Sequence, residues 1–582
     1  MPIRSDGPIT TGTVENLIQG LRSKPMTPEA VGAALVQSVG FAEKLVAVYT
    51  AEVAAGEVGP TGSGTASEEP ITGERAPTTL IYGRVQSGKT AAMILTSALC
   101  LENGFRLILV LTANNVALVD QTTNRFKALN GPRVFSSHKV DGYEWEGQED
   151  DLREDIAEGL VLVCAKDSFH LPKIIEFLQQ IEAPSYPALV LDDEADAATP
   201  DTTLAARTSG RANAPEHAST INRRVIENVM PGQEGESIGE ILPHSLYVQV
   251  TATPFLFFLQ RQNGRIRPTD TLLLEPGHGY CGGEIFFGDF DPDSANAPEP
   301  PLVLISTSER TRIHRRAIPE GLAASVEFFL LAAAAMVELG GRWPAEGFKH
   351  ISHTSPNIAD HAIVVRHIER HVTQLRRLIK QNPQAALEQL QSAYTELQRT
   401  LPHAPTLDVL IPQIAGALKQ VEYRAINSAA DAPSYGPRIN FLVGGNILGR
   451  GLTIDDLLVT YYVREAQVSQ MDTVWQHARM YGYREPLLPY TRVFLPPQVA
   501  ARFKEIHQTE EILREFLKTA AAGGEVPIRI ALGTRATRPN ATEATELRAI
   551  AAGVAQINAA YAVEDRTTAQ EIHRLLARAA LF

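Results

Sequence analysis

The stretch Tyr82–Thr90, YGRVQSGKT, constrains the fold of this chain more than any other part of the sequence. Gly83 is followed, after four residues, by Gly88, Lys89 and Thr90, which is the full pattern of a phosphate-binding loop. The apolar run before the loop predicts a buried strand, and the apolar residues after it predict the start of a helix. Such a loop directs backbone N–H groups and a helix N-terminus at a phosphate. The sequence therefore predicts a nucleotide site on an α/β sheet.

The nucleotide expected at this site is ATP with Mg²⁺. Lys89 is expected to reach the β- and γ-phosphates, and the Thr90 hydroxyl is expected to bind the metal. Gln86 and Ser87 are expected to line the phosphates together with the two glycines. The alternative is a glycine-rich turn that matches the pattern by chance, which the strand before it and the helix after it disfavour.

Composition limits the class of protein. The chain has 582 residues, 44% of them hydrophobic, so it can bury the cores of about three or four domains. Its formal charge of −14 argues against an extended cationic surface but allows a local basic groove. The three cysteines lie far apart, so neither zinc nor disulfides are expected. The first residues lack an apolar signal core, and the longest apolar run, Phe328–Val337, is too short to span a bilayer. We expect a cytoplasmic protein with no membrane partner.

From Thr78 onward, short apolar runs alternate with helical stretches, which predicts an α/β fold with parallel sheets. A linker rich in Gly, Ser, Thr and Pro precedes it over residues 55–77. We expect a helical segment at 1–54, a first α/β domain with an insertion at 78–318, a second with a helical insertion at 319–505, and a helical C-terminal segment at 506–582. The expected strands are Thr78–Tyr82, Leu107–Thr112, Leu160–Cys164, Ala188–Leu191, Ser245–Val250, Lys349–His353, Arg438–Val443, Leu458–Val463 and Thr491–Phe494.

An acidic cluster follows the fourth of these strands. A nucleotide site needs one carboxylate for Mg²⁺ and another for the attacking water. We assign Asp193 to the metal, with Asp192 as an alternate, and Glu194 to the water. The alternative is a solvated acidic turn. The hydroxyls of Thr251 and Thr253 follow the next strand and could hydrogen-bond this cluster, although their tetrapeptide alone is a weak signal.

Two further stretches carry candidate residues. In the glycine-rich stretch Gly444–Thr453, Gly449 and Arg450 could approach nucleotide phosphates, and Arg450 and Thr453 could reach a nucleic-acid backbone. The alternative is a plain connecting loop. A predicted helix from Gln470 to about Met480 precedes a second basic position. Arg479 and Arg484 are the candidates for an arginine finger, the alternative being an ordinary basic helix end.

These signals, in this order, resemble superfamily 2 helicases and translocases. The resemblance implies two RecA-like domains that clasp ATP between them, with Leu111–Gln121 as a stretch that contacts nucleic acid. It implies that a nucleic-acid track includes Thr112, Asn114, Gln121, Thr354 and Thr453. The sequence departs from the usual pattern in the spacing of the arginines after Gln476, so the finger stays open between Arg479 and Arg484.

More narrowly, the stretches GRVQSGKT, GHGYCGG, GGNILGRGLT and QHARMYGYR resemble the Z1 domain family over roughly residues 76–500. An endonuclease activity has been suggested for that family, which occurs near bacterial DNA-modification and phage-defence genes. The resemblance implies a nucleic-acid-directed ATPase acting on DNA in restriction or defence, with protein partners from such a system. The chain contains no Glu-x-Lys, and His350, His353 and His361 make only a weak metal site, so its residues do not indicate a nuclease.

Two other classes of function stay open from the sequence. One is an endonuclease whose cutting centre has no recognisable pattern. The other is an ATP-gated switch or assembly subunit that does not translocate.

Overall fold

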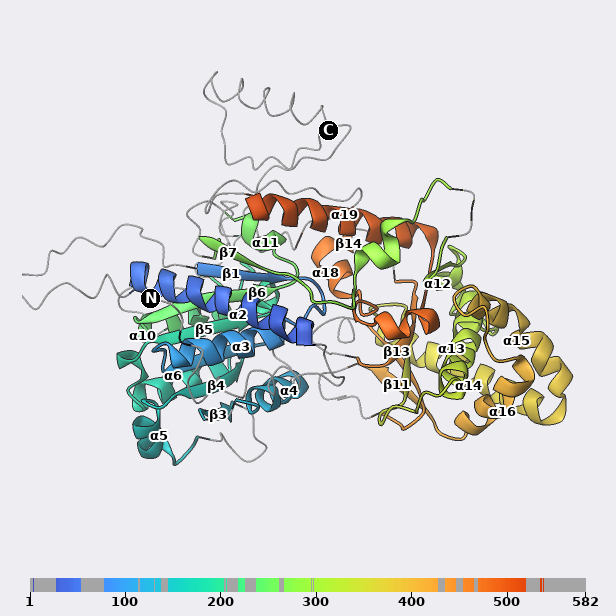
Figure 1. Cartoon of the computed structure of the whole chain (residues 1–582), viewed down its shortest axis with the longest axis horizontal. Helices are drawn as coiled ribbons and strands as arrows, with labels where there is room; N and C mark the ends of the chain where they lie inside the picture. The colour runs from blue at the N-terminus through green and yellow to red at the C-terminus, as the bar shows by residue number, and fades with distance from the viewer. Residues whose placement is uncertain are drawn as a thin grey trace, which may run out of the picture.

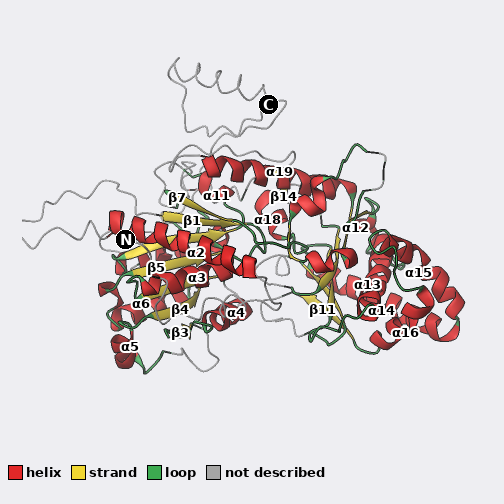
Figure 2. Ribbon diagram, viewed as in Figure 1, coloured by secondary structure: helices red, strands yellow, loops and turns green. Residues whose placement is uncertain are grey.

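The computed structural model of the chain describes residues 4, 28–53, 78–113, 116–129, 131–137, 145–203, 206, 218–225, 237–260, 266–294, 296, 298–427, 435–445, 454–464, 469–519, 534–535 and 537. Figure 1 shows two α/β lobes side by side, the first in blue to green and the second in green to orange. Each lobe has its own parallel sheet, and Figure 2 shows the two sheets separated by loops and by helix α18. The predicted fold class, two parallel sheets with flanking helices, is confirmed.

The first sheet has seven strands in the order β3-β4-β2-β5-β6-β1-β7, and every neighbouring pair is parallel. Its strands are β1 (Thr78–Gly83), β2 (Leu107–Thr112), β3 (Arg133–Ser136), β4 (Leu160–Ala165), β5 (Ala188–Asp193), β6 (Ser245–Thr251) and β7 (Asp270–Leu274). Its main helices are α2 (Pro28–Val48), α3 (Lys89–Glu102), α4 (Val116–Phe126), α5 (Glu149–Asp155) and α6 (His170–Gln180).

Both faces of this sheet are covered, which explains its continuous apolar strands. In β2, Ile108 and Val110 point into a core shared with α2 and α3. Leu107 and Leu109, on the alternate positions, join a second core with α5 and α6. Because side chains alternate between the faces of a strand, a strand buried on both sides reads as an unbroken hydrophobic run.

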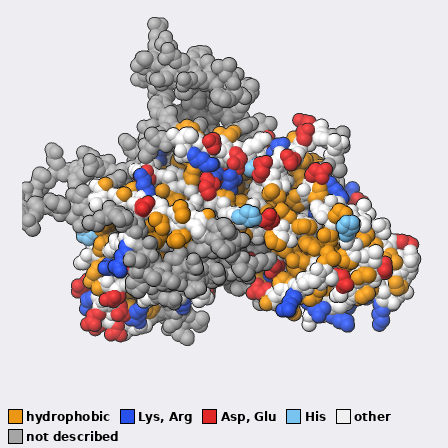
Figure 3. Space-filling view, viewed as in Figure 1, with side chains coloured by type: hydrophobic (Ala, Val, Ile, Leu, Met, Phe, Trp, Pro, Cys, Tyr) orange, Lys and Arg blue, Asp and Glu red, His pale blue; other side chains and the backbone are white. Residues whose placement is uncertain are grey.

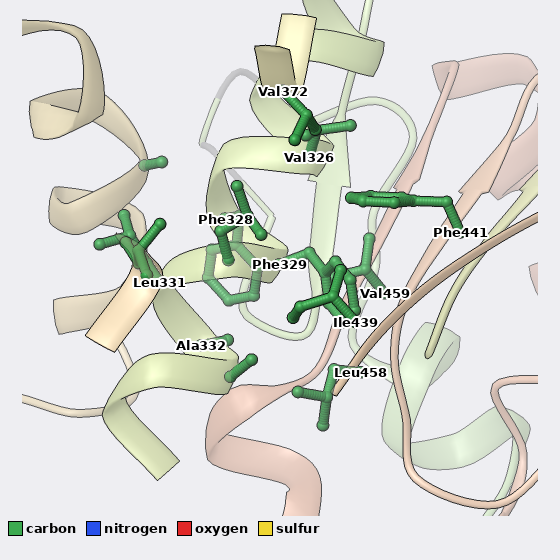
Figure 4. Packing of buried hydrophobic residues seen from close by; sticks show 14 of the residues in the cluster. Val326, Phe328, Phe329, Leu331, Ala332, Val372, Ile439, Phe441, Leu458 and Val459 are labelled. Atoms are coloured by element: carbon green, nitrogen blue, oxygen red, sulfur yellow. The ribbon is translucent and has the colours of Figure 1, made fainter. Parts of the chain in front are cut away.

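The second sheet has six parallel strands in the order β11-β12-β10-β13-β16-β9. Its strands are β9 (Leu302–Leu304), β10 (Phe348–His353), β11 (Val421–Ile426), β12 (Ile439–Gly444), β13 (Leu457–Tyr462) and β16 (Arg492–Leu495). The helices of this lobe are α12 (Glu309–Arg312), α13 (Glu320–Glu338), α14 (Ile358–Gln381), α15 (Pro383–Gln398), α16 (Leu407–Ala417) and α18 (Met471–Gln476). Figure 4 shows Phe328 and Phe329 of α13 packed towards Phe441 and Val459 of the sheet.

Helix α13 is long and apolar enough to cross a membrane by length and composition, with a mean hydropathy of 1.7. Most of that stretch, 72%, is buried inside the protein against the second sheet. Its apolar character is that of a core helix. It is the single such helix in the described part of the chain.

All nine expected strands form, with ends that differ from the expected ones by at most two residues. The second sheet also takes in β9, which lies before residue 319, so its residues start earlier than the boundary expected from sequence. Helix α18 ends at Gln476, short of the expected Met480. The edge strands β3, β7 and β11 have weaker apolar runs and were not expected.

Helix α19 (Pro497–Thr519) crosses the expected boundary at residue 505 without a break and joins the lobes. It leaves β16 of the second lobe and runs back over β7 of the first, along the top of Figure 1. Beneath it lies one hydrophobic core shared by both lobes, in which Phe255 of the first lobe lies 5.8 Å from Trp475 of the second, between ring centroids. Burial of apolar surface between the lobes stabilises their contact along this side.

Figure 3 shows charged side chains of both signs scattered among hydrophobic ones. Acidic side chains gather at the lower left, over α5, whose first turn carries Glu149, Asp150 and Asp151. Basic side chains show along the lower edge of the second lobe. The negative net charge is therefore unevenly spread.

Candidate nucleotide site between the lobes

The phosphate-binding loop joins β1 to α3 through a turn with left-handed residues. Gln86 has φ of 57° and Gly88 has φ of 94°. A Cβ at Gly83 would lie 2.7 Å from Lys89 Cγ and 2.9 Å from Ser87 Oγ. Ser87 Oγ is buried and has no hydrogen-bond partner. A loop with no room for a side chain and with an unpartnered buried hydroxyl fits a ligand that approaches the backbone closely, as a phosphate does.

Gly83→Ala is expected to lower the affinity for ATP at least about tenfold, because the new methyl group displaces Lys89 and Ser87. Titration with a fluorescent ATP analogue measures the change. Gly40→Ala is the matched control, since a Cβ at Gly40 of α2 has nothing within 4 Å. Equal affinities for the two variants would contradict this role of Gly83.

Two tyrosines, one from each side of the boundary between the lobes, hold the phosphate-binding loop in place. A short antiparallel pair, β8 (Tyr280–Cys281) with β15 (Gly482–Tyr483), lies against it. The Tyr280 hydroxyl donates to Val85 O at 2.6 Å, and the Tyr483 hydroxyl donates to Ser87 O at 3.0 Å. The stretch GHGYCGG therefore supports the loop and does not form a site of its own.

Helix α19 contacts the loop through Arg84. The Arg84 guanidinium pairs with both oxygens of Glu511 and with Glu510 Oε2 at 3.3 Å. Further along the helix, Arg514 donates to Leu274 O of β7 at 3.0 Å. His507, Glu510 and Glu511 place potential metal ligands within 4.8 Å of one another, but Arg84 already occupies both carboxylates. We read this cluster as an ion-pair network.

As pH rises from about 5 to 8, the free energy of unfolding is expected to fall less for the Glu510→Gln variant than for wild type. Burial raises the pKa of Glu510 to about 7, and the charges of Arg84 and Arg514 offset this only in part. The protonated carboxyl is favoured by folding, so its contribution is complete below the unfolded pKa and is lost as pH rises through about 7. Melting temperatures across this range measure the difference.

Glu511→Gln is the control for that pH dependence. Burial acts to raise the pKa of Glu511, but the hydrogen bond from Arg84 and the charges of Arg84, His507 and Arg514 together outweigh it and leave the pKa below the usual value. The contribution of Glu511 is then constant above pH 5. A Glu510→Gln melting profile parallel to that of wild type would contradict the assignment.

The acidic turn after β5 is held by a buried lysine, Lys166, at the end of β4. Its ammonium donates to Asp192 Oδ1 at 2.5 Å, to Asp193 O at 2.7 Å and to Glu194 O at 3.2 Å. Asp192 also accepts hydrogen bonds from Thr199 and Tyr247 through Oδ2. Because its oxygens are engaged and it is fully buried, Asp192 does not serve as the alternate metal ligand.

Asp193 ends β5 near Lys89 of the phosphate-binding loop, and Glu194 follows it. Burial and the neighbouring Glu194 raise the pKa of Asp193 and outweigh the opposite effect of Lys89 and Lys166, so that the pKa lies at about 7. The influence of Lys89 places that lysine near the carboxylate. Glu194 has φ of 50°, a left-handed conformation, and its carboxylate contacts Gln476 of the second lobe. A buried carboxylate beside a second one fits a bound cation, which would hold both ionised.

One amide joins the acidic turn to the second lobe. Gln476 Nε2 of α18 lies 3.2 Å from Glu194 Oε2, 3.2 Å from Asp196 Oδ2 and 2.9 Å from Thr253 Oγ1. Thr251 and Thr253 donate to the two oxygens of Asp196 at 2.5 and 2.9 Å. The expected link from these hydroxyls to the acidic cluster is present.

The two candidates for the arginine finger, Arg479 and Arg484, have different surroundings in the structure. Arg484 is buried and donates to the carbonyls of Leu457, Tyr481 and Arg479 at 2.8 to 3.0 Å. Burial lowers its pKa to about 10. The Arg484 guanidinium thereby shapes the loop that faces Gln86, and its Nη2 lies 3.5 Å from Gln86 Oε1. Arg479 is also buried, and its carbonyl accepts from Gln86 Nε2 at 3.5 Å. The engaged guanidinium argues against Arg484 as the finger, and Arg479 is the candidate that remains.

The structure gives little support to the predicted nucleic-acid contacts. Asn114, Gly449, Arg450 and Thr453 lie outside the described residues. Thr112 and Thr354 are fully buried, with hydroxyls that have no partner. In this conformation neither hydroxyl reaches a ligand in solution, because Thr112 ends β2, Thr354 follows β10, and both strands are buried throughout.

Gln121 of α4 is half-buried, and its Oε1 lacks a partner. Of the three histidines considered for a metal, His350 and His353 are buried at 0% exposure, and burial lowers their pKa values to about 3. His361 is held by Ser355 O and Asn427. Within the described ranges these three do not meet as a metal site.

Sequence reasoning missed Lys166, Arg84 and the two supporting tyrosines. Lys166 follows the apolar strand Leu160–Ala165, and a lysine at the carboxyl end of a central strand is a signal that could have been read. Arg84 stands inside the phosphate-binding loop, but its partners come from α19, over four hundred positions away. No local sequence pattern predicts that contact.

Residues 321–541 match the family model of the Z1 domain. Solved structures similar to the chain include the ATP-dependent Type ISP restriction-modification enzyme LlaBIII bound to DNA, at a TM-score of 0.37 and 13% identity, over 77% of this chain and 29% of that one. They also include S. cerevisiae Dbp5 bound to RNA and ADP BeF3, at a TM-score of 0.35 and 11% identity, over 76% of this chain and 89% of that one.

The chain thus spans under a third of the restriction-modification enzyme. Scores at this level carry no argument about activity. No curated protein matches the chain in sequence. The expected resemblance to the Z1 domain is confirmed for residues 321–541. These residues include α14, α19 and strands β10 to β16. The match therefore covers most of the second lobe and the helix that joins it to the first.

Proposed function

We propose that this chain is an ATP hydrolase of the helicase or translocase type that acts on DNA, in the cytoplasm, as part of a bacterial restriction or phage-defence system with protein partners. The observation that carries the proposal is the contact of Gln476 with Glu194. It joins the second lobe to the carboxylate expected to act on water. Catalysis that needs both lobes couples hydrolysis to their relative movement.

Each residue has a role in the proposed reaction. Lys89 and the loop backbone bind the phosphates, and Glu194 accepts a proton from the attacking water. Gln476 orients the Glu194 carboxylate, and Arg479 places positive charge at the phosphates from the second lobe. Mg²⁺ held by Thr90 and Asp193 would neutralise phosphate charge.

Steady-state ATP hydrolysis tests the proposal, measured alone and with single-stranded DNA, duplex DNA or RNA. We expect several-fold stimulation by DNA and its loss in Lys89→Ala. Stimulation by RNA alone would change the substrate class. Hydrolysis that depends on Lys89 but ignores every nucleic acid would overturn the translocase proposal.

A second candidate, the ATP-gated switch, has one observation in its favour. The shared core and α19 hold the lobes together along one side, so their freedom to separate is limited. Hydrolysis indifferent to nucleic acid would support this candidate. An endonuclease is favoured by no group of residues in the described part of the chain.

A further inference from the structure

Helix α14 carries a row of basic side chains along its outer face. Arg366, Arg370, Arg377 and Lys380 are all exposed, and their spacing of 4, 7 and 3 residues puts them on one stripe of the helix. The opposite face, with Val364, Ile368, Val372 and Leu375, is buried against the second lobe. We call these four basic residues the α14 stripe.

The stripe is not neutralised by neighbouring acids. None of its four members forms an ion pair with any described residue, and the positions between them on that face, Thr373 and Gln374, are uncharged. Glu369 lies beside the stripe, three residues after Arg366, but it forms no ion pair with any of its members, and its charge adds to burial in raising the pKa of Tyr423 of β11. Like charges in a row without counterions repel one another, so a chain with a net charge of −14 keeps them here at a cost.

A second element adds charge at the start of the stripe. The turn after α12 crosses α14, because His367 Nε2 contacts Ile313 O at 2.9 Å. Arg315 and Arg316 of this turn are exposed and form no ion pair with described residues. Arg366 and Arg370 lie near the same histidine and act to lower its pKa beyond the effect of burial.

The stripe leads away from the cleft. Helix α14 follows β10, so its first turn lies at the carboxyl edge of the second sheet, where ligands of α/β folds bind. From Arg366 to Lys380 the helix rises roughly 21 Å, the length of several phosphates in a nucleic-acid strand. Figure 1 shows α14 on the outer part of the second lobe.

We propose that the α14 stripe, extended by Arg315 and Arg316, binds the phosphate backbone of a nucleic acid outside the cleft between the lobes. The proposal rests on the proposed function. Guanidinium groups bind phosphates strongly without reading bases, and nucleic-acid interfaces are far more positive than protein interfaces. An acidic protein fits less well, because protein interfaces need an apolar centre and Ile358 is the one large exposed apolar residue on α14 within the described residues.

The test removes three charges at once, in Arg366→Ala/Arg370→Ala/Arg377→Ala. Alanine favours the helix, so the fold is expected to survive, with an unchanged melting temperature. Binding of fluorescent duplex and single-stranded DNA is measured over a series of salt concentrations. We expect affinity to fall about tenfold or more, and the slope of log affinity against log salt to shrink by about 2 for single strands and about 3 for duplex. ATP hydrolysis without DNA should stay unchanged.

The matched control, Lys173→Ala/Arg342→Ala/Lys419→Ala, removes three exposed charges elsewhere. A second variant with lysine at the three stripe positions should retain most of the binding, because phosphate contact needs charge. A stripe variant that binds DNA as well as the control overturns the stripe proposal alone and leaves the surface to another partner. Wild-type protein that neither binds DNA nor responds to it overturns both this proposal and the proposed function.

Discussion

Glu194→Gln is expected to lower kcat for ATP hydrolysis by about 10² to 10⁴ while ATP binding changes little. The substitution removes the group that takes the proton from water but keeps an oxygen in the same position. That oxygen can still accept from Gln476 Nε2, which lies 3.2 Å from Glu194 Oε2. The contact between the lobes should therefore persist in the variant.

Two measurements are needed to test this expectation. Steady-state hydrolysis gives kcat, and titration with a fluorescent ATP analogue gives the affinity. Asp196→Asn provides a useful comparison, since Asp196 accepts from Thr251, Thr253 and Gln476 and is placed as an orienting residue. A Glu194→Gln enzyme with normal kcat would move the role of base to another group.

Lys166→Met is expected to lower the free energy of unfolding of the first lobe by about 3 to 5 kcal/mol, since one partner of a buried ion pair is removed. Lys166 and Asp192 are both 0% exposed, and their charged atoms lie 2.5 Å apart. The variant leaves the Asp192 carboxylate buried without its counter-ion. It also frees the carbonyls of Asp193 and Glu194, so the acidic turn loses its shape and hydrolysis should fall with stability.

The double variant Lys166→Met/Asp192→Asn separates the two effects. It removes the uncompensated charge, so part of the lost stability should return, while the carbonyls of the acidic turn stay without their donor. Thermal unfolding monitored by circular dichroism gives the stability, and kcat gives the activity. A double variant that recovers full activity would show that Lys166 acts only through its ion pair.

Local patterns in the sequence located the core strands and the first half of the site. The strand before Gly83, the helix after Lys89 and the acidic end of β5 each have a signal within a few residues, because burial on two faces demands continuous apolar strands. The search for continuous apolar runs did not find the strands at the edges of the sheets. Strands such as β7 and β11 are half-exposed, so their side chains need not be apolar.

The sequence by itself determined that the chain folds into two parallel sheets and which loop is the candidate for phosphate binding, because strand periodicity and the spacing of glycines in a loop are local properties. The tertiary structure alone decided which groups meet across the lobes. Lys166 reaches the acidic turn, Gln476 reaches Glu194, and α19 brings Glu511 to Arg84. Each of these contacts joins elements that are distant in the chain. No local sequence pattern predicts which distant side chain packing will bring into contact.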